Sequence, residues 1–420
     1  MDTFNHQEGV TLARIQACRV CRSIKLELVL DLGTTAFTGV FPSSADEIVD
    51  HGSLAVLVCT DCGLAQLADS FPAEILYGDN YGYRSGLNAS MVSHLRRTAN
   101  RLEQRSGLMS GDVVLDIGAN DGTLLRSFTT KDLVRVGIDP TIAKFREFYD
   151  ESIIVREDFF SAESYKQTIN ADAALVTSIA MFYDLEDPVA FAKDIASILR
   201  DGGLWYFEQS YMPWMLRSGA YDTICHEHLE YYSLTNIRDI IERAGLELVD
   251  ATTNAVNGGS ISVTARKGQS SEPSSVVADW LIQQEQRQEV HSLAAWSQFG
   301  SRVADRQRDL LDLLTSLKRR GMSVMALGAS TKGNVLLQTS GIGQDLIRAV
   351  GDVNPDKFGR FLPGTGIPIL SEEEVLKEDP DYLLVLPWHF RETFMKNLHP
   401  FLSRGGRLIF PLPDIEVVGF

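Results

Sequence analysis

The sequence contains few cysteines and no long apolar run, and both absences narrow the class of protein it encodes. Five cysteines in 420 residues are too few for a secreted disulfide scaffold, so a reducing cytoplasm is the expected location. No run approaches the roughly 18 apolar residues that a membrane span needs, so we expect no membrane-spanning helix. The first 16 residues lack the apolar segment of a signal peptide and carry Asp2, His6 and Glu8.

Basic charge is also scarce. The chain has 39 Lys and Arg against 56 Asp and Glu, which gives a formal net charge of −17. Such a surface repels phosphate backbones, so we expect no nucleic-acid partner, although a local basic pocket can still hold a small anion. At about 100–200 residues per domain, the length predicts two or three domains.

Four of the five cysteines form two pairs near the N-terminus. Each pair has the spacing Cys-x2-Cys, and 37 residues separate the pairs, among which Leu26–Leu30 is predicted to form a strand. Zinc prefers four soft ligands in a tetrahedron, and two such loops supply them without leaving an open position for catalysis. We therefore expect a structural zinc site; iron, disulfides and unliganded buried thiols are the alternatives. The predicted ligands are Cys18, Cys21, Cys59 and Cys62.

Short apolar segments alternate with amphipathic ones in the middle of the chain. This alternation predicts a parallel, doubly wound sheet with helices between its strands. A polar linker is expected at Gly268–Ser275, then a helical stretch over Val276–Arg319 and a second α/β unit that starts with a strand at Val324–Leu327. In the first unit a helix is predicted from Leu124 onward, and the predicted strands are Val113–Ile117, Val134–Ile138, Ile153–Val155, Ala173–Thr177 and Leu204–Glu208.

The first of these strands ends in an acid and runs into a glycine-containing loop. Asp116 is followed by Gly118, Asn120 and Gly122, at the switch point where doubly wound sheets bind ligands. The loop lacks the third glycine of the dinucleotide fingerprint. An acid here suits the cationic methionine portion of S-adenosylmethionine (SAM), and Asp139, which ends the second strand, suits the ribose hydroxyls.

Two residues after the third strand complete the predicted SAM site. Asp158 is positioned to accept the adenine amino group and Phe159 to cover the face of the ring. The order of strand, acid, glycines, helix, strand and acid favours SAM; another nucleotide or a vestigial site is the alternative.

Two histidines flank a glutamate just beyond the fifth strand. The segment reads Cys225-His226-Glu227-His228, on the side of the sheet where the methyl group of SAM is expected. Histidine is the natural base near neutral pH, and a neighbouring carboxylate can fix its tautomer. Base chemistry is the favoured interpretation, with a structural polar loop or a His-x-His metal site as alternatives. The spacing does not decide which histidine acts, and Cys225 fits packing or pocket lining better than nucleophilic attack.

Several loops farther along the chain suit contact with a substrate. Asn257-Gly258-Gly259-Ser260 predicts a tight turn, and Gly328–Asn334 places hydroxyls and a lysine at a helix N-terminus, which favours an anion. The latter lacks P-loop spacing, so ATP hydrolysis is not expected, and a purely structural turn is the alternative. The residues assigned to the substrate here are Asn257, Ser330, Thr331, Lys332, Asn334 and Asp352.

The whole chain resembles the bacterial sugar C-methyltransferases that act on nucleotide-linked 4-keto deoxysugars. The resemblance implies a zinc module, a SAM domain and a C-terminal Rossmann-like domain, with the nucleotide-sugar between the last two. Two positions depart from the family pattern: Cys225, where tyrosine is common, and Asp184, where histidine is frequent. The motifs that carry the resemblance are the two Cys-x2-Cys pairs with Gly63–Gln66, Tyr81-Gly82-Tyr83, Asp116-Ile117-Gly118, His226-Glu227-His228, Asn257–Ser260, Lys332-Gly333-Asn334 and Pro363–Pro368.

The resemblance also implies roles for individual residues. His228 corresponds to the base, Glu227 to its partner and Tyr81 to a catalytic residue beside the sugar, with Tyr83 and Cys225 also against the substrate. The base would remove the hydrogen next to the 4-keto group, and the enolate carbon would then attack the SAM methyl group.

The sequence thus predicts an α/β enzyme in three parts. These are a four-cysteine zinc-binding module over residues 1–75, a central doubly wound class I SAM methyltransferase domain over 76–268, and a C-terminal Rossmann-like domain for the nucleotide-sugar over 269–420. Methylation of a hydroxyl group and a scaffold protein with a degenerate SAM fold are the competing hypotheses. Both a monomer and a homo-oligomer are compatible with the sequence.

Overall fold

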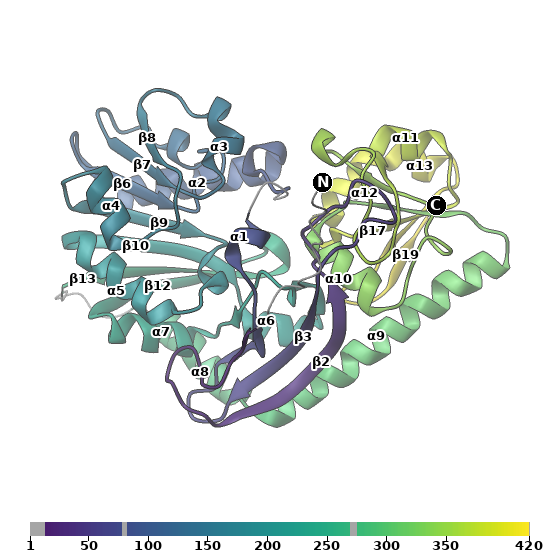
Figure 1. Cartoon of the computed structure of the whole chain (residues 1–420), viewed down its shortest axis with the longest axis horizontal. Coiled ribbons are helices and arrows are strands. Elements are labelled where there is room, and N and C mark those ends of the chain that lie inside the picture. Colours follow the sequence, from purple (N-terminus) through teal and green to yellow (C-terminus); the bar gives the residue numbers. More distant parts are fainter. Residues whose placement is uncertain (1–12, 78–81, 269–274, 420) are drawn as a thin grey trace, which may run out of the picture.

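The computed structural model describes residues 13–77, 82–268 and 275–419 and has two lobes (Figure 1). One lobe contains a seven-stranded sheet and the other a six-stranded sheet. A long N-terminal hairpin and helix α9, Leu293–Arg319, run beneath both lobes and connect them. None of the helices in the described ranges has the length and apolarity to cross a bilayer.

The seven-stranded sheet has the strand order β12-β13-β10-β9-β6-β7-β8. Six of its strands run in the same direction, and β13, which lies between β10 and β12, runs antiparallel to both. The chain reverses direction across the sheet between β6 and β9, which creates a switch point at their carboxyl ends. The strands are β6 Val113–Ile117, β7 Val134–Ile138, β8 Ile153–Arg156, β9 Ala173–Ile179, β10 Leu199–Ser210, β12 Leu246–Asn254 and β13 Ser260–Lys267.

Helices cover both faces of this sheet and bury two separate apolar cores. The predicted helix after Leu124 is wrong: only one 3-10 turn, Leu125–Ser127, forms there. Glu103 of α2 accepts the backbone N–H groups of Thr129 and Thr130, both at 2.6 Å, and so ends the helical path. The main helices are α2 Ala89–Ser106, α4 Ala162–Thr168, α5 Pro188–Ile198, α6 Met212–Ser218, α7 Leu234–Arg243 and α8 Val276–Arg287.

The predicted helical stretch over Val276–Arg319 is two helices. It breaks at Glu289, which has a φ of 48°, and α9 restarts where the Ser292 side chain accepts the N–H of Ala295. His291 lies in this break and bonds to Ser233 Oγ at 2.8 Å. This hydrogen bond therefore attaches the segment between α8 and α9 to the first lobe.

The six-stranded sheet has the order β16-β15-β14-β17-β18-β19, with only β19 antiparallel. Its first strand coincides with the predicted Val324–Leu327, and α10, Thr331–Thr339, follows the glycine loop as expected. The other strands are β15 Val350–Asp352, β16 Ile369–Ser371, β17 Tyr382–Val385, β18 Arg407–Phe410 and β19 Glu416–Val418; the helices are α11 Glu372–Lys377, α12 Arg391–Asn397 and α13 His399–Ser403.

The N-terminal part is more extended than its sequence suggests. Strand β2, Leu26–Ala36, is 11 residues long rather than the expected five, and it pairs with β3, His51–Cys59. The hairpin packs into one apolar core with the C-terminal lobe, whereas Cys18, Cys59 and Leu64 pack into a core of the first lobe. Strand β4, Ala65–Leu67, adds to the same sheet, as does β11, Glu230–Tyr231, from the first lobe.

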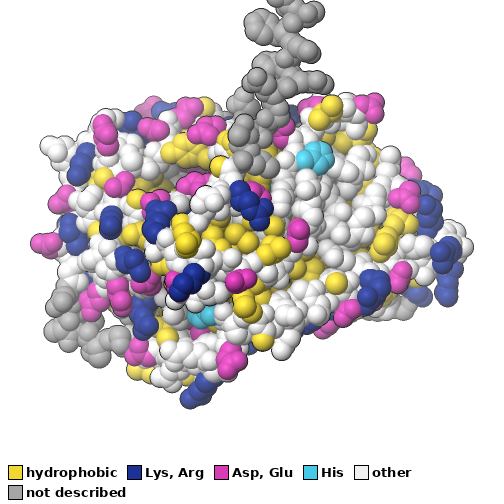
Figure 2. All heavy atoms as spheres, turned by 60° about the horizontal axis from the view of Figure 1, so that its bottom comes forward, with side chains coloured by type: hydrophobic (Ala, Val, Ile, Leu, Met, Phe, Trp, Pro, Cys, Tyr) yellow, Lys and Arg dark blue, Asp and Glu magenta, His cyan; other side chains and the backbone are white. Residues whose placement is uncertain are grey.

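Charge is mixed on the molecular surface. On the face that Figure 2 shows, Lys and Arg side chains are interspersed with Asp and Glu rather than gathered into a basic stripe.

Candidate active site

The four predicted metal ligands come together in one cluster. One sulfur from each of Cys18, Cys21, Cys59 and Cys62 lies within 4.8 Å of the other three. The Cys18–Cys62 and Cys21–Cys59 sulfur distances are 3.6 and 3.5 Å, close to the roughly 3.8 Å edge of a zinc–thiolate tetrahedron. These distances are too long for disulfides. The donor set therefore fits structural zinc, which would have all four positions filled by the protein.

The predicted SAM loop lies at the switch point of the seven-stranded sheet. Gly118 and Gly122 have φ values of 71° and 73°, and Asn120 between them has 52°, so the loop needs left-handed backbone at three positions. A Cβ on Gly122 would lie 2.9 Å from the Tyr149 ring. The loop geometry thus excludes larger side chains where a ligand would approach the backbone.

Asp116 is buried at the end of β6 and accepts a hydrogen bond from Thr177 Oγ1 at 2.7 Å. The register of the sheet brings these two residues opposite each other on β6 and β9. Burial, with a smaller effect from the charge of Asp139, raises the pKa of Asp116 to about 7. A cation beside this carboxyl group would favour its ionised form.

Asp139 follows β7 and lies beside the same loop. Its Oδ2 accepts the backbone N–H of Asn120 at 2.8 Å, and its Oδ1 accepts the N–H of Thr141 at 2.6 Å. The structure therefore brings Asp116, Gly118, Asn120 and Asp139 together at one edge of the sheet, as the sequence predicts for a nucleoside site.

A short segment before α2 covers the glycine loop. Asn120 Oδ1 accepts the N–H of Ser85 at 2.9 Å, and Asn120 Nδ2 donates to the carbonyl of Tyr83 at 3.1 Å. The N–H of Gly86 donates to Asp121 Oδ2 at 2.9 Å, and a Cβ on Gly86 would lie 2.4 Å from that oxygen. Tyr83 itself is 48% exposed. Tyr81, the predicted catalytic tyrosine, lies outside the described residues.

The two predicted adenine contacts lie at the rim of this site. Asp158 forms an ion pair with Arg156 at 2.9 Å, and Phe159 is 42% exposed. The ion pair occupies one carboxylate oxygen of Asp158. The contacts of Asp158 and Phe159 with adenine stay predictions.

His228 has the geometry of a base whose tautomer is fixed. Its Nδ1 lies 2.7 Å from the carbonyl oxygen of Thr223. A carbonyl oxygen only accepts, so Nδ1 carries the hydrogen and Nε2 keeps its lone pair. Burial, reinforced by the nearby Lys332 ammonium, lowers the pKa of His228 to about 3, which keeps the ring neutral. The Tyr183 ring packs against it, with centroids 4.1 Å apart.

His226 lies in a very different environment. It is fully buried between the rings of Phe37 and Phe71, each with its centroid 4.9 Å away. Its Nε2 lies 3.2 Å from the carbonyl oxygen of Gly52, and burial lowers its pKa to about 4. This geometry favours a packing role for His226 and leaves His228 as the stronger candidate for the base.

Glu227 lies near the end of the hairpin rather than against the imidazole of His228. Thr38 Oγ1 donates to Glu227 Oε2 at 3.4 Å, and a Cβ on Gly39 would lie 2.3 Å from Oε1. Burial raises the pKa of Glu227 and that of the neighbouring Asp184. The predicted orienting role of Glu227 is thus filled by the Thr223 carbonyl, and the half-buried carboxyl groups of Glu227 and Asp184 lie near the buried thiol of Cys225.

The C-terminal lobe supplies a lysine to the same region. Lys332, in the first turn of α10, donates from Nζ to the carbonyl of Asn257 at 2.9 Å. The predicted turn at Asn257 packs on the other lobe, because a Cβ on Gly258 would lie 3.1 Å from Trp388. Trp388 Nε1 in turn donates to Asp222 Oδ2 at 2.8 Å. Both lobes therefore meet around His228.

The other residues predicted on α10 differ in what they contact. Ser330 Oγ caps the helix by accepting the N–H of Gly333 at 3.1 Å, and Thr331 Oγ1 lies 3.6 Å from the position of a Cβ on Gly39. Asn334 is fully buried and donates to the carbonyl of Thr38 at 3.3 Å. This contact gives Asn334 a role in holding the hairpin.

Asp352 ends β15 and lies beside Lys357, a residue to which the sequence assigned no role. Lys357 Nζ lies 3.6 Å from Asp352 Oδ2, 4.8 Å from the centroid of the Phe41 ring, and donates to the carbonyl of Ala329 at 2.7 Å. Burial lowers its pKa. Thr177, Thr223 and Lys357 were all missed: strand pairing places Thr177 beside Asp116, the packing of the hairpin on the C-terminal lobe places Lys357 against Phe41, and Thr223 acts through a backbone carbonyl that residue type does not reveal.

Models of known families match three consecutive parts of the chain. They are described as "Putative zinc binding domain" for residues 18–77, "Methyltransferase domain" for 86–251 and "C-methyltransferase C-terminal domain" for 255–413. Among solved structures, a Haloferax volcanii methyltransferase complexed with its Trm112 activator shows 19% identity and a TM-score of 0.36, over 44% of this chain and 95% of its own. A SAM-dependent methyltransferase of Clostridium acetobutylicum shows 12% identity and a TM-score of 0.35, over 42% and 92%.

A relative of known class matches the chain almost from end to end. The C-methyltransferase NovU of Streptomyces niveus is 30% identical over 408 residues, which cover 96% of this chain and 97% of the relative. The order of the matched models agrees with the cysteine cluster, the switch-point site and the second parallel sheet. The chain therefore belongs to the C-methyltransferase family and is a SAM-dependent methyltransferase with a zinc-binding N-terminal domain.

Proposed function

We propose that this enzyme methylates the carbon next to the ketone of a nucleotide-linked 4-keto-deoxysugar. One observation carries the proposal: His228 is half-buried and donates a hydrogen bond from Nδ1 to the Thr223 carbonyl, so its Nε2 keeps a lone pair that can accept a proton. An O-methyltransferase also needs a base, but the C-methyltransferase relative favours a carbon nucleophile. The reducing environment that four metal-binding thiolates require suits a cytoplasmic enzyme.

The first lobe would hold SAM and supply the base. Asp116 and Asp139 would hold the methionine and ribose portions of SAM, which supplies an electrophilic methyl group when bound. His228 Nε2 would take the proton from the carbon next to the ketone, and the resulting enolate carbon would attack the methyl group in line, with S-adenosylhomocysteine as the leaving group. Placing base, carbon and methyl group together can lower the barrier by about 7–11 kcal/mol.

The C-terminal lobe would hold the nucleotide part of the substrate. Lys332 and the N-terminus of α10 favour a diphosphate, and Lys357 beside Asp352 offers a second cation. Tyr81, Tyr83 and Cys225 remain proposed sugar contacts. Asp158 and Phe159 remain proposed adenine contacts.

The substrate class is tested by incubating the purified enzyme with methyl-labelled SAM and a panel of nucleotide-linked 4-keto-deoxysugars. We expect one or more products in which NMR places the label on a carbon next to the former ketone. Matched 4-hydroxy sugars should stay unmodified, because they cannot form the enolate. A label on oxygen would contradict the proposal and support the O-methyltransferase hypothesis.

Replacing His228 with Asn should lower kcat by about 10²–10⁴-fold, since the group that accepts the proton is lost. SAM affinity should stay within threefold of wild type, because His228 lies outside the predicted SAM site. The exposed His399→Asn variant is the matched control and should retain wild-type turnover. Turnover in His228→Asn at the wild-type rate would remove His228 from the mechanism.

SAM affinity should fall as the pH drops below about 7, the pKa to which burial raises Asp116. Above this pH the free enzyme already carries the carboxylate that pairs with the cation. Below it, Asp116 must release a proton on binding, so Kd should rise up to about tenfold per pH unit. Calorimetry from pH 5.5 to 8.5 measures this slope. The Asp116→Asn variant should bind weakly with a flatter slope, and an equal slope in both proteins would exclude Asp116 as the titrating group.

A further inference from the structure

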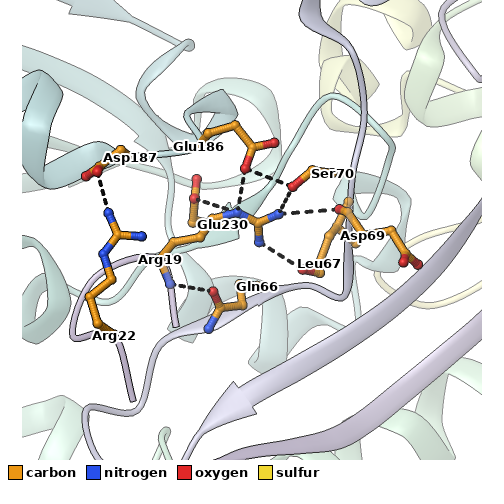
Figure 3. Close-up of polar contacts among 9 residues, drawn as sticks. All are labelled: Arg19, Arg22, Gln66, Leu67, Asp69, Ser70, Glu186, Asp187 and Glu230. Carbon is orange, nitrogen blue, oxygen red and sulfur yellow. Dashed lines mark hydrogen bonds and ion pairs between the residues drawn. The ribbon is translucent and has the colours of Figure 1, made fainter. Parts of the chain in front are cut away.

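The first Cys-x2-Cys loop carries two arginines that contact different partners (Figure 3). Arg19, directly after Cys18, turns inward, and 2% of its side chain is exposed. Arg22, directly after Cys21, turns outward and pairs with Asp187 while 59% of its side chain stays exposed. One short loop thus contains a buried arginine and a closely matched exposed one.

Arg19 is held on several sides by the N-terminal module. Its backbone N–H donates to Gln66 Oε1 at 3.0 Å, and its Nη1 donates to the carbonyl of Leu67 at 2.8 Å. Its Nη2 donates to Ser70 Oγ at 2.8 Å and to the carbonyl of Asp69 at 3.4 Å. These contacts fix the guanidinium in one orientation, with Nε facing the first lobe.

Arg19 Nε faces two carboxylates from the first lobe. It lies 3.6 Å from Glu230 Oε1 and 3.5 Å from Glu186 Oε2. The side chain of Glu230 is fully buried, whereas 57% of that of Glu186 is exposed. Within the described ranges, Arg19 is the one cation that forms an ion pair with Glu230. Burial raises the pKa of Glu230 and the Arg19 guanidinium opposes this shift, so Arg19 favours the ionised form of the buried carboxyl group.

Glu230 lies two residues after His228 and starts β11. In that strand Glu230 pairs with Gln66, and the carbonyl of Leu229 accepts the N–H of Leu67 at 2.8 Å. Farther along, Asn236 Nδ2 donates to the carbonyl of Cys62 at 2.9 Å. The segment that carries His228 is therefore attached to the metal-binding module by backbone, amide and charged contacts.

We propose that Arg19 is a positioning residue for methyl transfer: it anchors the His228 segment to the metal-binding loop through Glu230. This inference rests on the proposed role of His228. The four cysteine sulfurs, when they hold zinc, fix the backbone from which Arg19 extends. The metal site would thus set the position of a base on another lobe, beyond stabilising its own module.

The test compares zinc-loaded Arg19→Gln with Arg22→Gln, the matched exposed control from the same loop. For Arg19→Gln we expect kcat to fall about 10–100-fold, the scale of a misplaced catalytic group, while KM for SAM and zinc content stay near wild type. Arg22→Gln should stay within about twofold of wild type, because exposed ion pairs contribute little. Equal losses in both variants, or wild-type kcat in Arg19→Gln, would overturn the proposal.

Hydrogen exchange measured by mass spectrometry gives a readout that needs no substrate. Peptides covering residues 224–232 should exchange faster in Arg19→Gln than in Arg22→Gln, while peptides from β6 and β14 keep wild-type protection. If the wild type methylated no sugar on the panel, this result would still test the anchoring. Unchanged exchange over 224–232 would contradict it.

A double-mutant cycle tests whether Arg19 acts through Glu230. Glu230→Gln removes the carboxyl group that Arg19 faces without changing the side-chain shape, and it remains informative if Arg19→Gln folds poorly. Combining both substitutions should lower kcat no further than Arg19→Gln alone, because the two residues form one contact. Losses that multiply in the double variant would show that they act separately.

Discussion

The structure depends on one buried polar segment, residues 226–231, where all three parts of the chain meet. A buried backbone must find hydrogen-bond partners, and this segment finds them in the N-terminal sheet and in the first lobe. Its side chains reach three different environments: His226 the hairpin core, Glu227 the end of β2 and His228 the space beside Lys332. The segment can therefore hold one arrangement only when all three parts are in place.

Because of this constraint, the zinc-binding module contributes to the structure of both lobes. The module shares apolar cores with both lobes, and its hairpin contacts α10 through Gln338, which exchanges two hydrogen bonds with the backbone of Ala36. A site formed between lobes gains specificity from each wall. It also needs a rigid connection between them, which the hairpin and α9 supply (Figure 1).

Much of the fold is readable from the sequence because local signals agree with it. Apolar runs such as Val113–Ile117 and Val324–Leu327 become strands with the predicted bounds, and the paired cysteines come together as expected. The rest depends on distant contacts: β2 extends through polar residues because β3 pairs with it, and the helix expected after Leu124 ends on Glu103. In the site, the pattern His-Glu-His could not separate two histidines that the fold places in an apolar core and beside a backbone carbonyl.

The most direct test of the account measures proton removal without methyl transfer. The enzyme is saturated with S-adenosylhomocysteine, which has no methyl group to give, and a nucleotide-linked 4-keto-deoxysugar is incubated with the complex in D2O. We expect deuterium to enter the carbon next to the ketone with the wild-type enzyme, and we expect the His228→Asn substitution to abolish this exchange. Equal exchange in both proteins would contradict the central claim that His228 is the base.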